Sequence, residues 1–335
     1  MVWAALIKLF ELIILPGFTF LITLSLFYEW VDRKFYARLQ NRYGPLHTGP
    51  KGLLQPLADF IKLLSKEDIV PAAVDKRLFS IVPLILFALP LTALFTIPVI
   101  EPMAYAAFEG DLIYVLFIST LIVVAKFIAA WSSTNRFSAL GGERLAFQLI
   151  GYEIPIAISF IAPAILAKSL SISTIGIWIA NNPIFLLLLL PGLAVSLICS
   201  LAELEKVPFD IPEAEQEIVA GWQTEFSGRK LALIRLSGDL ELLLASALIS
   251  VIFLGGPNGP VPFATPPIPE IFYIIWFLIK VTIVVVILSN LRTIFARLRI
   301  DQMMSLAWRY LLPISIIQIL IVQLYLAFNL GFLSW

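Results

Sequence analysis

The chain has 335 residues, of which 60% are hydrophobic and 14% charged, and its formal net charge is zero. A soluble domain is about half apolar and about a quarter charged, so this composition excludes an ordinary soluble protein and indicates a membrane protein. The absence of net positive charge argues against nucleic acid as a partner. With one cysteine and one histidine, the chain cannot by itself ligate an iron–sulfur cluster or a typical zinc site.

Eight apolar segments are each long enough to cross a bilayer. They lie at roughly 3–28, 78–100, 112–131, 145–167, 184–202, 230–254, 270–289 and 309–329. The first is too long for a signal-peptide core and lacks a cleavage site, so we expect a retained helix. Several segments contain proline, which membrane helices tolerate as kinks: Pro83, Pro90, Pro98, Pro155, Pro163, Pro191 and Pro313. The sequence therefore predicts an all-α integral membrane protein forming one transmembrane domain over 1–335, with no convincing internal repeat.

The first connection contains a shorter helical pattern, GLLQPLADFIKLLSKE. Its apolar residues recur at helical spacing at Leu53, Leu57, Phe60 or Ile61, and Leu64. This pattern predicts an amphipathic helix lying in the headgroup plane. Such a helix is either a surface anchor or the roof of a binding chamber, and the sequence leaves both open.

The basic residues predict the topology. Eighteen of the 23 Lys and Arg residues fall in the first, third, fifth and seventh connections, four fall within spans, and one, Lys168, falls in an even connection. By the positive-inside rule the odd connections are cytoplasmic and both termini lie outside. The predicted cytoplasmic connections are 29–77, 132–144, 203–229 and 290–308. The cell membrane is the expected location.

Charged residues within spans are costly and mark ion pathways by default. Lys126 can alternatively snorkel to the nearby membrane surface. Arg235 and Asp239 are four residues apart, so a local salt bridge is the competing explanation. A local pair likewise accounts for Lys8 and Glu11. Other charges have no such local partner, and a buried network explains them better: Glu153 and Lys280.

The fifth connection gathers seven of the 23 acidic residues: Glu203, Glu205, Asp210, Glu213, Glu215, Glu217 and Glu225. Crowded carboxylates raise one another's pKa, and partial burial adds a shift in the same direction. Such a group can hold and pass protons near neutral pH. A solvated acidic loop that docks a basic partner explains the charge pattern equally well.

The segment VPFDIPEAEQEIVAGWQTEFSG resembles the signature of the complex I membrane subunit of the NuoH type, the NADH dehydrogenase subunit 1 family. Four other stretches agree in order: RLQNRYGPLHTGPKGLLQPLADFIKLLSKE, WSSTNRFSALGG, LIGYEIP and RLRIDQMMSLAWRYLLP. Together they cover about 38 to 313. The resemblance implies an eight-helix anchor that joins a peripheral redox arm to an antiporter-like membrane arm and is not a catalyst by itself.

The resemblance also implies roles by position. The acidic loop would lie at the junction with the redox arm, and Glu153 would match the family's fourth-helix glutamate. With the charges in spans, the predicted ion-pathway and coupling residues are Glu153, Glu203, Glu205, Asp210, Glu213, Glu215, Glu217, Asp239, Glu241, Lys126 and Lys280. The residues predicted to dock the peripheral arm are Arg33, Lys34, Arg38, Arg42, Arg136, Glu225, Arg297, Arg299 and Asp301.

One stretch departs from the quinone-reducing members. After the acidic loop those members read like FALFFLAEY, whereas this chain reads LALIRLSGDLELL, with Gly238 where a glutamate is expected. This departure favours the membrane subunit of an archaeal energy-converting, ferredoxin-linked [NiFe] hydrogenase that moves H⁺ or Na⁺. The alternatives are the same subunit in a quinone or methanophenazine reductase, and, in another class, a stand-alone secondary ion transporter. The transporter interpretation would need repeats and a midplane site, and the sequence shows neither.

The hydrogenase interpretation assigns no cofactor to this chain. Iron–sulfur clusters and a [NiFe] centre are expected in partner subunits, together with antiporter-like membrane subunits. A co-purifying large subunit with two CxxC pairs would identify that type of complex.

Overall fold

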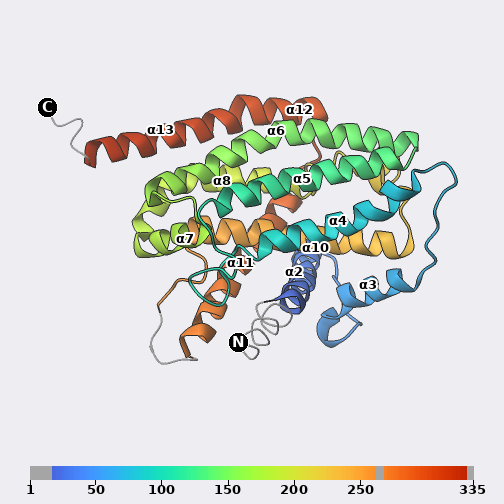
Figure 1. The fold of residues 1–335 in the computed structure, drawn as a ribbon, viewed down its shortest axis with the longest axis horizontal. Coiled ribbons are helices and arrows are strands. Elements are labelled where there is room, and N and C mark those ends of the chain that lie inside the picture. Colours follow the sequence, from blue (N-terminus) through green and yellow to red (C-terminus); the bar gives the residue numbers. More distant parts are fainter. Residues whose placement is uncertain (1–16, 261–267, 330–335) are drawn as a thin grey trace, which may run out of the picture.

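The computed structural model describes residues 17–260 and 268–329, and this part of the chain is helical with irregular connections (Figure 1). The helices are α2 (Phe18–Leu39), α3 (Gln55–Ser65), α4 (Lys76–Leu94), α5 (Asp111–Ser132), α6 (Arg136–Ala167), α7 (Ile172–Asn181), α8 (Leu186–Glu203), α9 (Glu215–Ile218), α10 (Gly228–Leu254), α11 (Ile268–Ile294), α12 (Ile300–Leu306) and α13 (Leu312–Asn329). Short helical turns lie at Pro50–Gly52, Pro183–Phe185, Gly221–Gln223 and Ala307–Leu311. The expected all-α class is confirmed for this part of the chain.

Seven helices among the described residues are long and apolar enough to cross a membrane. They correspond to the second to eighth predicted segments, so seven of the eight predicted spans have a counterpart. Most of the first predicted span lies outside the described residues. Its described part belongs to α2, which runs on to Leu39 instead of ending near 28 and is not among the seven. The prediction of eight spans therefore stays a prediction.

Several predicted boundaries were wrong. α6 begins at Arg136 rather than near 145, because the polar stretch before the apolar run is also helical. α4 ends at Leu94, and the chain is irregular from there to Gly110. Pro98 therefore lies in a connection and kinks no helix, whereas Pro83, Pro90, Pro155, Pro163 and Pro191 lie inside helices as expected. The short apolar helix α7 was not predicted.

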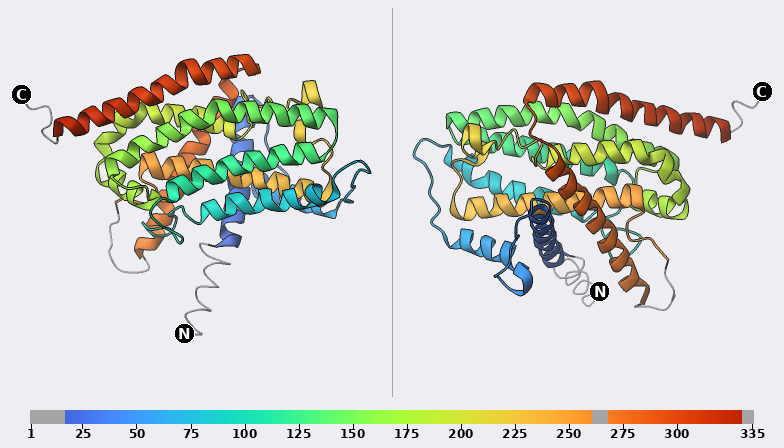
Figure 2. Two further views of the ribbon diagram at one scale, coloured as in Figure 1. Left: turned by 45° about the horizontal axis from the view of Figure 1, so that its top comes forward. Right: turned by 180° about the vertical axis from the view of Figure 1, so that it is seen from behind.

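Helices α4, α5, α6, α8, α10 and α13 run side by side, while α2 and α11 cross them, and α10 lies in the middle of the bundle (Figures 1 and 2). α10 contacts α2, α3, α4, α7, α8 and α11, and 89% of its apolar window is buried. Small buried residues of α10, such as Ala245, Ser246 and Ala247, permit this close packing because they let neighbouring backbones approach. Its buried hydroxyls find carbonyl partners: Ser246 donates to the Leu242 carbonyl at 2.7 Å, and Ser237 donates across to the Leu86 carbonyl of α4 at 2.7 Å.

The connections gather at two ends of the bundle. At one end, the Asp75 amide donates to the Ser132 carbonyl at 3.2 Å and the Leu298 amide donates to the Pro208 carbonyl at 3.1 Å. The Ile69 amide donates to the Ser227 hydroxyl at 3.1 Å, so the first, third, fifth and seventh connections meet. We call this the charged end, formed by 40–75, 133–135, 204–227 and 295–299. At the opposite end, the Ala104 amide donates to the Ser173 hydroxyl at 3.0 Å. The odd connections thus share one end, as the basic residues predicted.

Candidate functional site

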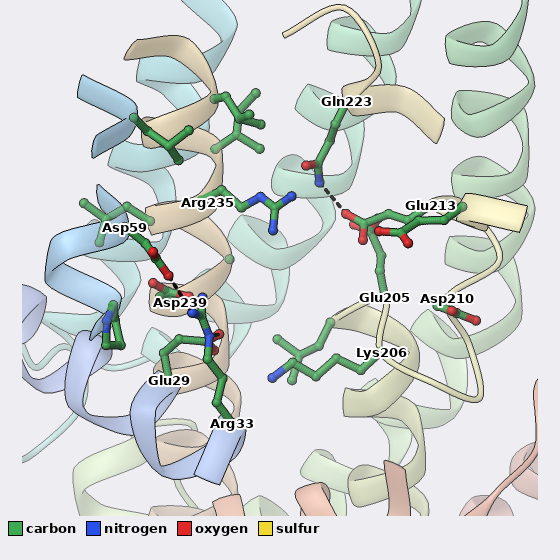
Figure 3. A pocket seen from close by; sticks show the side chains of 18 of the residues that line it. Glu29, Arg33, Asp59, Glu205, Lys206, Asp210, Glu213, Gln223, Arg235 and Asp239 are labelled. Carbon is green, nitrogen blue, oxygen red and sulfur yellow. Dashed lines mark hydrogen bonds and ion pairs between the residues drawn. The ribbon is translucent and has the colours of Figure 1, made fainter. Parts of the chain in front are cut away.

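A cavity of about 690 Å³ opens at the charged end. α2, α3 and α10 form one side of it, and the segment that follows α8 forms the other (Figure 3). Most of its side chains are polar, and many are charged: Glu29, Arg33, Asp59, Lys62, Lys66, Glu205, Lys206, Asp210, Glu213, Glu215, Arg235, Asp239, Arg292 and Arg297. This density of opposite charges at a membrane protein's end makes the cavity the candidate site.

Local backbone geometry folds the acidic segment back onto the helices. Phe209 and Ile211 are buried, so the segment is pinned through apolar side chains between its acidic ones. Gly221 has φ +55, and a Cβ there would lie 1.8 Å from the Pro212 carbonyl oxygen, so only glycine permits this turn. The turn places the buried Trp222 so that its indole N–H donates to Glu205 Oε2 at 2.9 Å. An exposed loop would need none of these contacts.

Lys126, Glu205 and Glu241 form a buried charge cluster at the inner wall of this segment. The Lys126 ammonium lies 2.6 Å from Glu205 Oε1 and 2.8 Å from Glu241 Oε2, and the Ser237 hydroxyl hydrogen-bonds Glu241 at 3.0 Å. All three charged side chains are at most 7% exposed. Lys126 therefore does not snorkel. One ammonium between two carboxylates leaves the cluster with room for one further proton.

Two more carboxylates lie beside α5, deeper along the bundle. Glu203 hydrogen-bonds Ser119, and Glu153 Oε1 accepts from the Thr120 hydroxyl at 2.6 Å. The other oxygen of Glu153 is buried without a partner among the described residues. Because Thr120 precedes Lys126 by six residues, the row of ionisable groups extends about 9 Å along α5. Proton transfer over that length requires waters between the groups.

The remaining predicted acids divide into two sets. Asp210 pairs with Arg297, and Glu217 pairs with Arg144 at 2.6 Å, so both fasten the segment to neighbouring elements. Glu215 is exposed at the rim of the cavity, and Glu213 accepts from the Gln223 amide. Only Glu203, Glu205 and Glu213 thus face the interior. The sequence treated all of them as one group, and the structure separates them.

Burial raises the pKa of Glu213 to about 7, and repulsion from Glu205 adds to this shift. Asp59 of α3 behaves differently. Its partial burial would raise its pKa, but hydrogen bonds from Arg33 and Gln55 and the Arg33 charge outweigh burial and hold its pKa below the usual range. The cavity therefore contains one carboxyl whose pKa is raised toward neutral pH and, on its other side, one whose pKa is lowered (Figure 3).

Arg235 and Asp239 both line the cavity but do not form the local salt bridge considered above. Figure 3 shows Arg235 pointing toward Gln223 and Glu213, while Asp239 lies next to Arg33 and Glu29. Within the described residues no ion pair joins the two. Arg33 is instead held by Glu29 at 2.6 Å and Asp59 at 2.8 Å. α10 thus presents a guanidinium and a carboxyl to different parts of the cavity (Figure 3).

Sequence reasoning missed Asp32, which joins three elements. Its carboxylate is 2% exposed and accepts from Lys206 at 2.7 Å, Arg292 at 3.0 Å and Ser289 at 2.5 Å. Arg292 also stacks on Tyr36, with its guanidinium carbon 4.2 Å from the ring centroid. We call these five residues the Asp32 clamp. The sequence did contain a signal for this site: Asp32 lies just beyond an apolar run and directly before the basic pair Arg33 and Lys34 of α2.

The predicted docking residues are not all available at the surface. Arg33 is used inside the cavity, and the Lys34 ammonium donates to the carbonyls of Pro45 at 2.7 Å and Lys51 at 3.0 Å. The Glu225 carboxylate accepts a hydrogen bond from the Asn135 amide, so it binds the connection that precedes α6. Arg297 is bound to Asp210. The remaining residues of the predicted docking set are exposed at the charged end: Arg38, Arg42, Arg136, Arg299 and Asp301.

Lys280, predicted to belong to the ion pathway, lies elsewhere. It is on α11, and its ammonium donates to the Asn258 carbonyl at 2.6 Å in the connection at the opposite end. The structure does not bring it near the cluster around Lys126. Lys8 and Glu11 lie outside the described residues. Within the described ranges, no three His, Cys, Asp or Glu residues are arranged to hold a metal ion.

Comparison with known proteins identifies the family. The family model for NADH dehydrogenase matches residues 11–323. The chain belongs to the NuoH-type family of complex I membrane subunits. It is 39% identical to the H subunit of the NADH-quinone oxidoreductase of Dehalococcoides mccartyi over 91% of this chain and 83% of that protein. It is 36% identical to the NADH-quinone oxidoreductase subunit 8 of Thermus thermophilus over 92% of this chain and 85% of that protein.

A third relative, the H subunit of the NADH-quinone oxidoreductase of Bacillus mycoides, is 39% identical over 88% of this chain and 86% of that protein. These three relatives are bacterial and are named as quinone oxidoreductase subunits. The comparisons therefore confirm the resemblance to the NuoH-type family at the level of the whole chain. They give no support to the finer hydrogenase, ferredoxin, sodium or archaeal assignments, which stay predictions.

Proposed function

We propose that this chain is the membrane anchor and coupling subunit of a multisubunit, complex-I-like oxidoreductase in the cell membrane. It docks a peripheral redox module at the charged end and converts a change there into charge movement along buried carboxylates. The relatives support membership in such a complex, because they are named as subunits of one enzyme. The observation that carries the coupling role is the cluster of Lys126 with Glu205 and Glu241, which links the cavity wall to the bundle interior.

The cluster couples through geometry and charge. Glu205 belongs to the same segment as Glu213, which lines the cavity and titrates near neutral pH. A proton or an electron arriving beside that segment changes the field at Lys126, because charges in a poorly solvated interior are weakly screened. Lys126 can then favour one of its two carboxylates over the other. A proton taken up by the carboxylate that Lys126 releases has Glu203 and Glu153 as the next acceptors along α5.

The electron acceptor has two candidates. The names of the relatives favour a quinone. The alternative is ferredoxin-driven H₂ evolution by a partner [NiFe] subunit, and the cavity gives it one supporting observation. Arg235 and Asp239 line the space next to Gly238, where the quinone-reducing members are expected to carry a glutamate. Whether H⁺ or Na⁺ moves is part of the same proposal, since carboxylates can carry either ion.

The coupling role is tested in sealed vesicles that contain the whole complex. Glutamine keeps the size of glutamate and its hydrogen bonding but cannot ionise. Glu153→Gln should therefore assemble normally and lower the ions moved per electron, while Glu215→Gln, an exposed acid at the rim, is the matched control and should keep the ratio. A fully assembled Glu153→Gln complex with unchanged turnover and an unchanged ion-to-electron ratio would refute the proposal.

The docking role is tested separately. Arg38 and Arg42 are exposed at the charged end, so reversing both charges should release the peripheral subunits into the soluble fraction. Retention of those subunits would place the docking surface elsewhere.

The purified complex also identifies the electron acceptor. A purified complex that reduces a quinone supports the first candidate, and a co-purified large subunit with two CxxC pairs that evolves H₂ supports the second.

A further inference from the structure

α11 presents an unusual outer surface. Apart from Ile294 in its last turn, its exposed large apolar side chains are isoleucines at four-residue spacing: Ile271, Ile275, Ile279, Ile283 and Ile287. Residues at this spacing form a ridge along a helix, and such ridges pack into the grooves of a second helix. We call these five residues the isoleucine ridge. α11 packs on α2 and α10. The exposure of the ridge residues places them on the side of α11 away from these contacts.

A charged residue lies beside this ridge. Lys280 lies three residues before Ile283 and one after Ile279, at the middle of α11, about 18 Å along the helix from its start at Ile268. An ammonium has three donors, and the structure records one acceptor for it, the Asn258 carbonyl. Among residues 17–260 and 268–329 no carboxylate lies within ion-pair distance of it. The Lys280 ammonium therefore lies near the connection at the opposite end of the bundle, and none of the described carboxylates balances its charge.

The comparison with α13 shows that exposure alone does not explain this arrangement. α11 and α13 are the two least buried spans, with 28% and 22% of their apolar windows buried. α13 exposes a mixed set of apolar residues and has no charged residue along its length, as a lipid-facing helix should. Acyl chains satisfy such a surface but offer nothing to an ammonium. Lys280 therefore distinguishes the exposed side of α11 from that of α13.

We propose that the isoleucine ridge is the seat of a transmembrane helix from a second subunit, and that this helix places a carboxylate against the Lys280 ammonium. The ridge supplies shape and dispersion contacts, and the lysine supplies selectivity and register, because an ion pair forms only when both charges are aligned. This inference rests on the proposed membership in a multisubunit complex. It does not depend on the coupling role of the Lys126 cluster, which lies on other helices.

The test uses the whole complex in its native membrane. A photo-crosslinking benzoylphenylalanine replaces Ile279 or Ile283, and Ile317 of α13 provides the lipid-facing reference. We expect the two ridge positions to yield one discrete adduct with a membrane subunit, whose crosslinked helix contains an Asp or Glu. Adducts with lipid alone at both ridge positions, in a preparation whose other subunits still co-purify, would overturn this inference and leave the proposed function standing. Loss of all co-purifying subunits in the unsubstituted protein would overturn both.

Substitution of Lys280 separates charge from packing. Lys280→Met keeps the length of the side chain and removes the charge, so it should lower the crosslink yield roughly threefold to tenfold, the range that one polar contact between membrane helices provides. Lys280→Arg keeps the charge and should retain most of the yield. Equal yields in all three proteins would refute the role of the ammonium.

The only carboxylate side chain outside the described residues is that of Glu11. If Glu11→Gln reproduces the Lys280→Met effect, the counter-charge is internal and the proposed partner carboxylate is wrong.

Discussion

Lys126 holds together two carboxylates that reach it from separate parts of the chain. Glu205 follows α8 and Glu241 lies in α10, so the ammonium on α5 joins three elements through two short contacts of 2.6 and 2.8 Å. Removing it would leave two buried carboxylates facing each other without a cation. Breaking a buried ion pair in this way costs about 3–5 kcal/mol, whereas an exposed pair contributes about 0–1 kcal/mol.

We therefore predict that Lys126→Met lowers the unfolding temperature of the purified complex markedly, and that Lys62→Met does not. Lys62 is 61% exposed in its pair with Asp59 and is the matched surface control. The additional substitution Glu241→Gln should recover part of the loss, because it removes one of the two uncompensated charges. Thermal unfolding followed by circular dichroism measures all four proteins. Equal unfolding temperatures for the two lysine variants would contradict the interpretation of the cluster as buried.

Glu213 is the residue whose charge should change within the physiological pH range. Its pKa in the folded chain is about 7, against an ordinary value of 4.5, because burial disfavours its charged form. A raised acid pKa means that the folded state holds a proton that the unfolded state has released. The stabilising contribution of this proton is complete below the unfolded value and is lost as pH rises through about 7.

The predicted consequence is a stability that declines as pH rises between about 4.5 and about 7, with part of the decline absent in Glu213→Gln. Infrared difference spectra give a direct check, since a protonated carboxyl has its own C=O stretch. That band should titrate near pH 7 in the unsubstituted protein and be missing in the variant. An unchanged titration in Glu213→Gln would assign the proton to another group.

At the scale of elements, the Asp32 clamp ties α2 and α11 to the start of the acidic segment. Asp32 on α2 accepts from Lys206 and from Arg292, while Ser289 completes its hydrogen bonding. Lys206 directly follows Glu205, so the clamp fixes the position of one carboxylate of the Lys126 cluster. A shift of α2 or α11 would move Lys206. Because Lys206 is bonded directly to Glu205, the shift would also move one carboxylate of the Lys126 cluster.

We predict that Asp32→Asn loosens the segment 204–227 without unfolding the bundle. Two cations would lose their shared carboxylate, and the backbone amides of that segment should exchange hydrogen faster, while those of α13 keep their protection. Asp68→Asn is the matched control, because it removes the partner of Lys230 at a more exposed site, 34% against 2% exposed for Asp32. Hydrogen exchange measured by mass spectrometry on the purified complex distinguishes the variants. Similar exchange in both would remove the special role of the clamp.

The elements show how far the sequence could be interpreted alone. The apolar runs behind α5 and α10 end at glycine, charged or serine residues, and both helices were predicted within two residues of their ends. α6 was predicted too short because its first turns are polar on one side and carry no continuous apolar run. The clamp could not be predicted, since it joins Asp32 to residues 174 to 260 positions away in the chain. Pairings at such separations depend on how helices pack, which periodicity does not encode.

In the candidate site, too, local features could be predicted from the sequence and long-range pairings could not. Local composition located the acidic segment, and the cost of a charge in a membrane singled out Lys126, Glu153 and Glu241. Composition could not separate the acids that face inward from those that pair at the surface, such as Glu217 with Arg144. That separation comes from the turn at Gly221, which turns Trp222 inward.

At the scale of the whole molecule, charge and contacts describe the same asymmetry. The connections rich in Lys and Arg meet at the charged end, and the others meet at the opposite end, as the contacts of Ser132 and Ala104 show. The cavity, the buried cluster and the exposed arginines all belong to the first end. The isoleucine ridge and Lys280 lie along the flank of the bundle. Docking of a soluble module and packing of a membrane subunit are thereby kept on different surfaces.

The asymmetry predicts the orientation in the membrane. Cytoplasmic connections carry the excess of basic residues, so the charged end should face the cytoplasm. A cysteine at Arg136 should react with a membrane-impermeant maleimide only from the cytoplasmic side, and a cysteine at Asn258 only from the outer side. The native Cys199 is buried and should contribute little background, which the unsubstituted protein measures. Sealed vesicles of both orientations provide the two sides, and detergent permeabilisation shows that each site can react at all. Labelling of Asn258→Cys from the cytoplasmic side alone would reverse the orientation. It would also remove the basis for placing the peripheral module at the charged end, because soluble cytoplasmic subunits could not reach it.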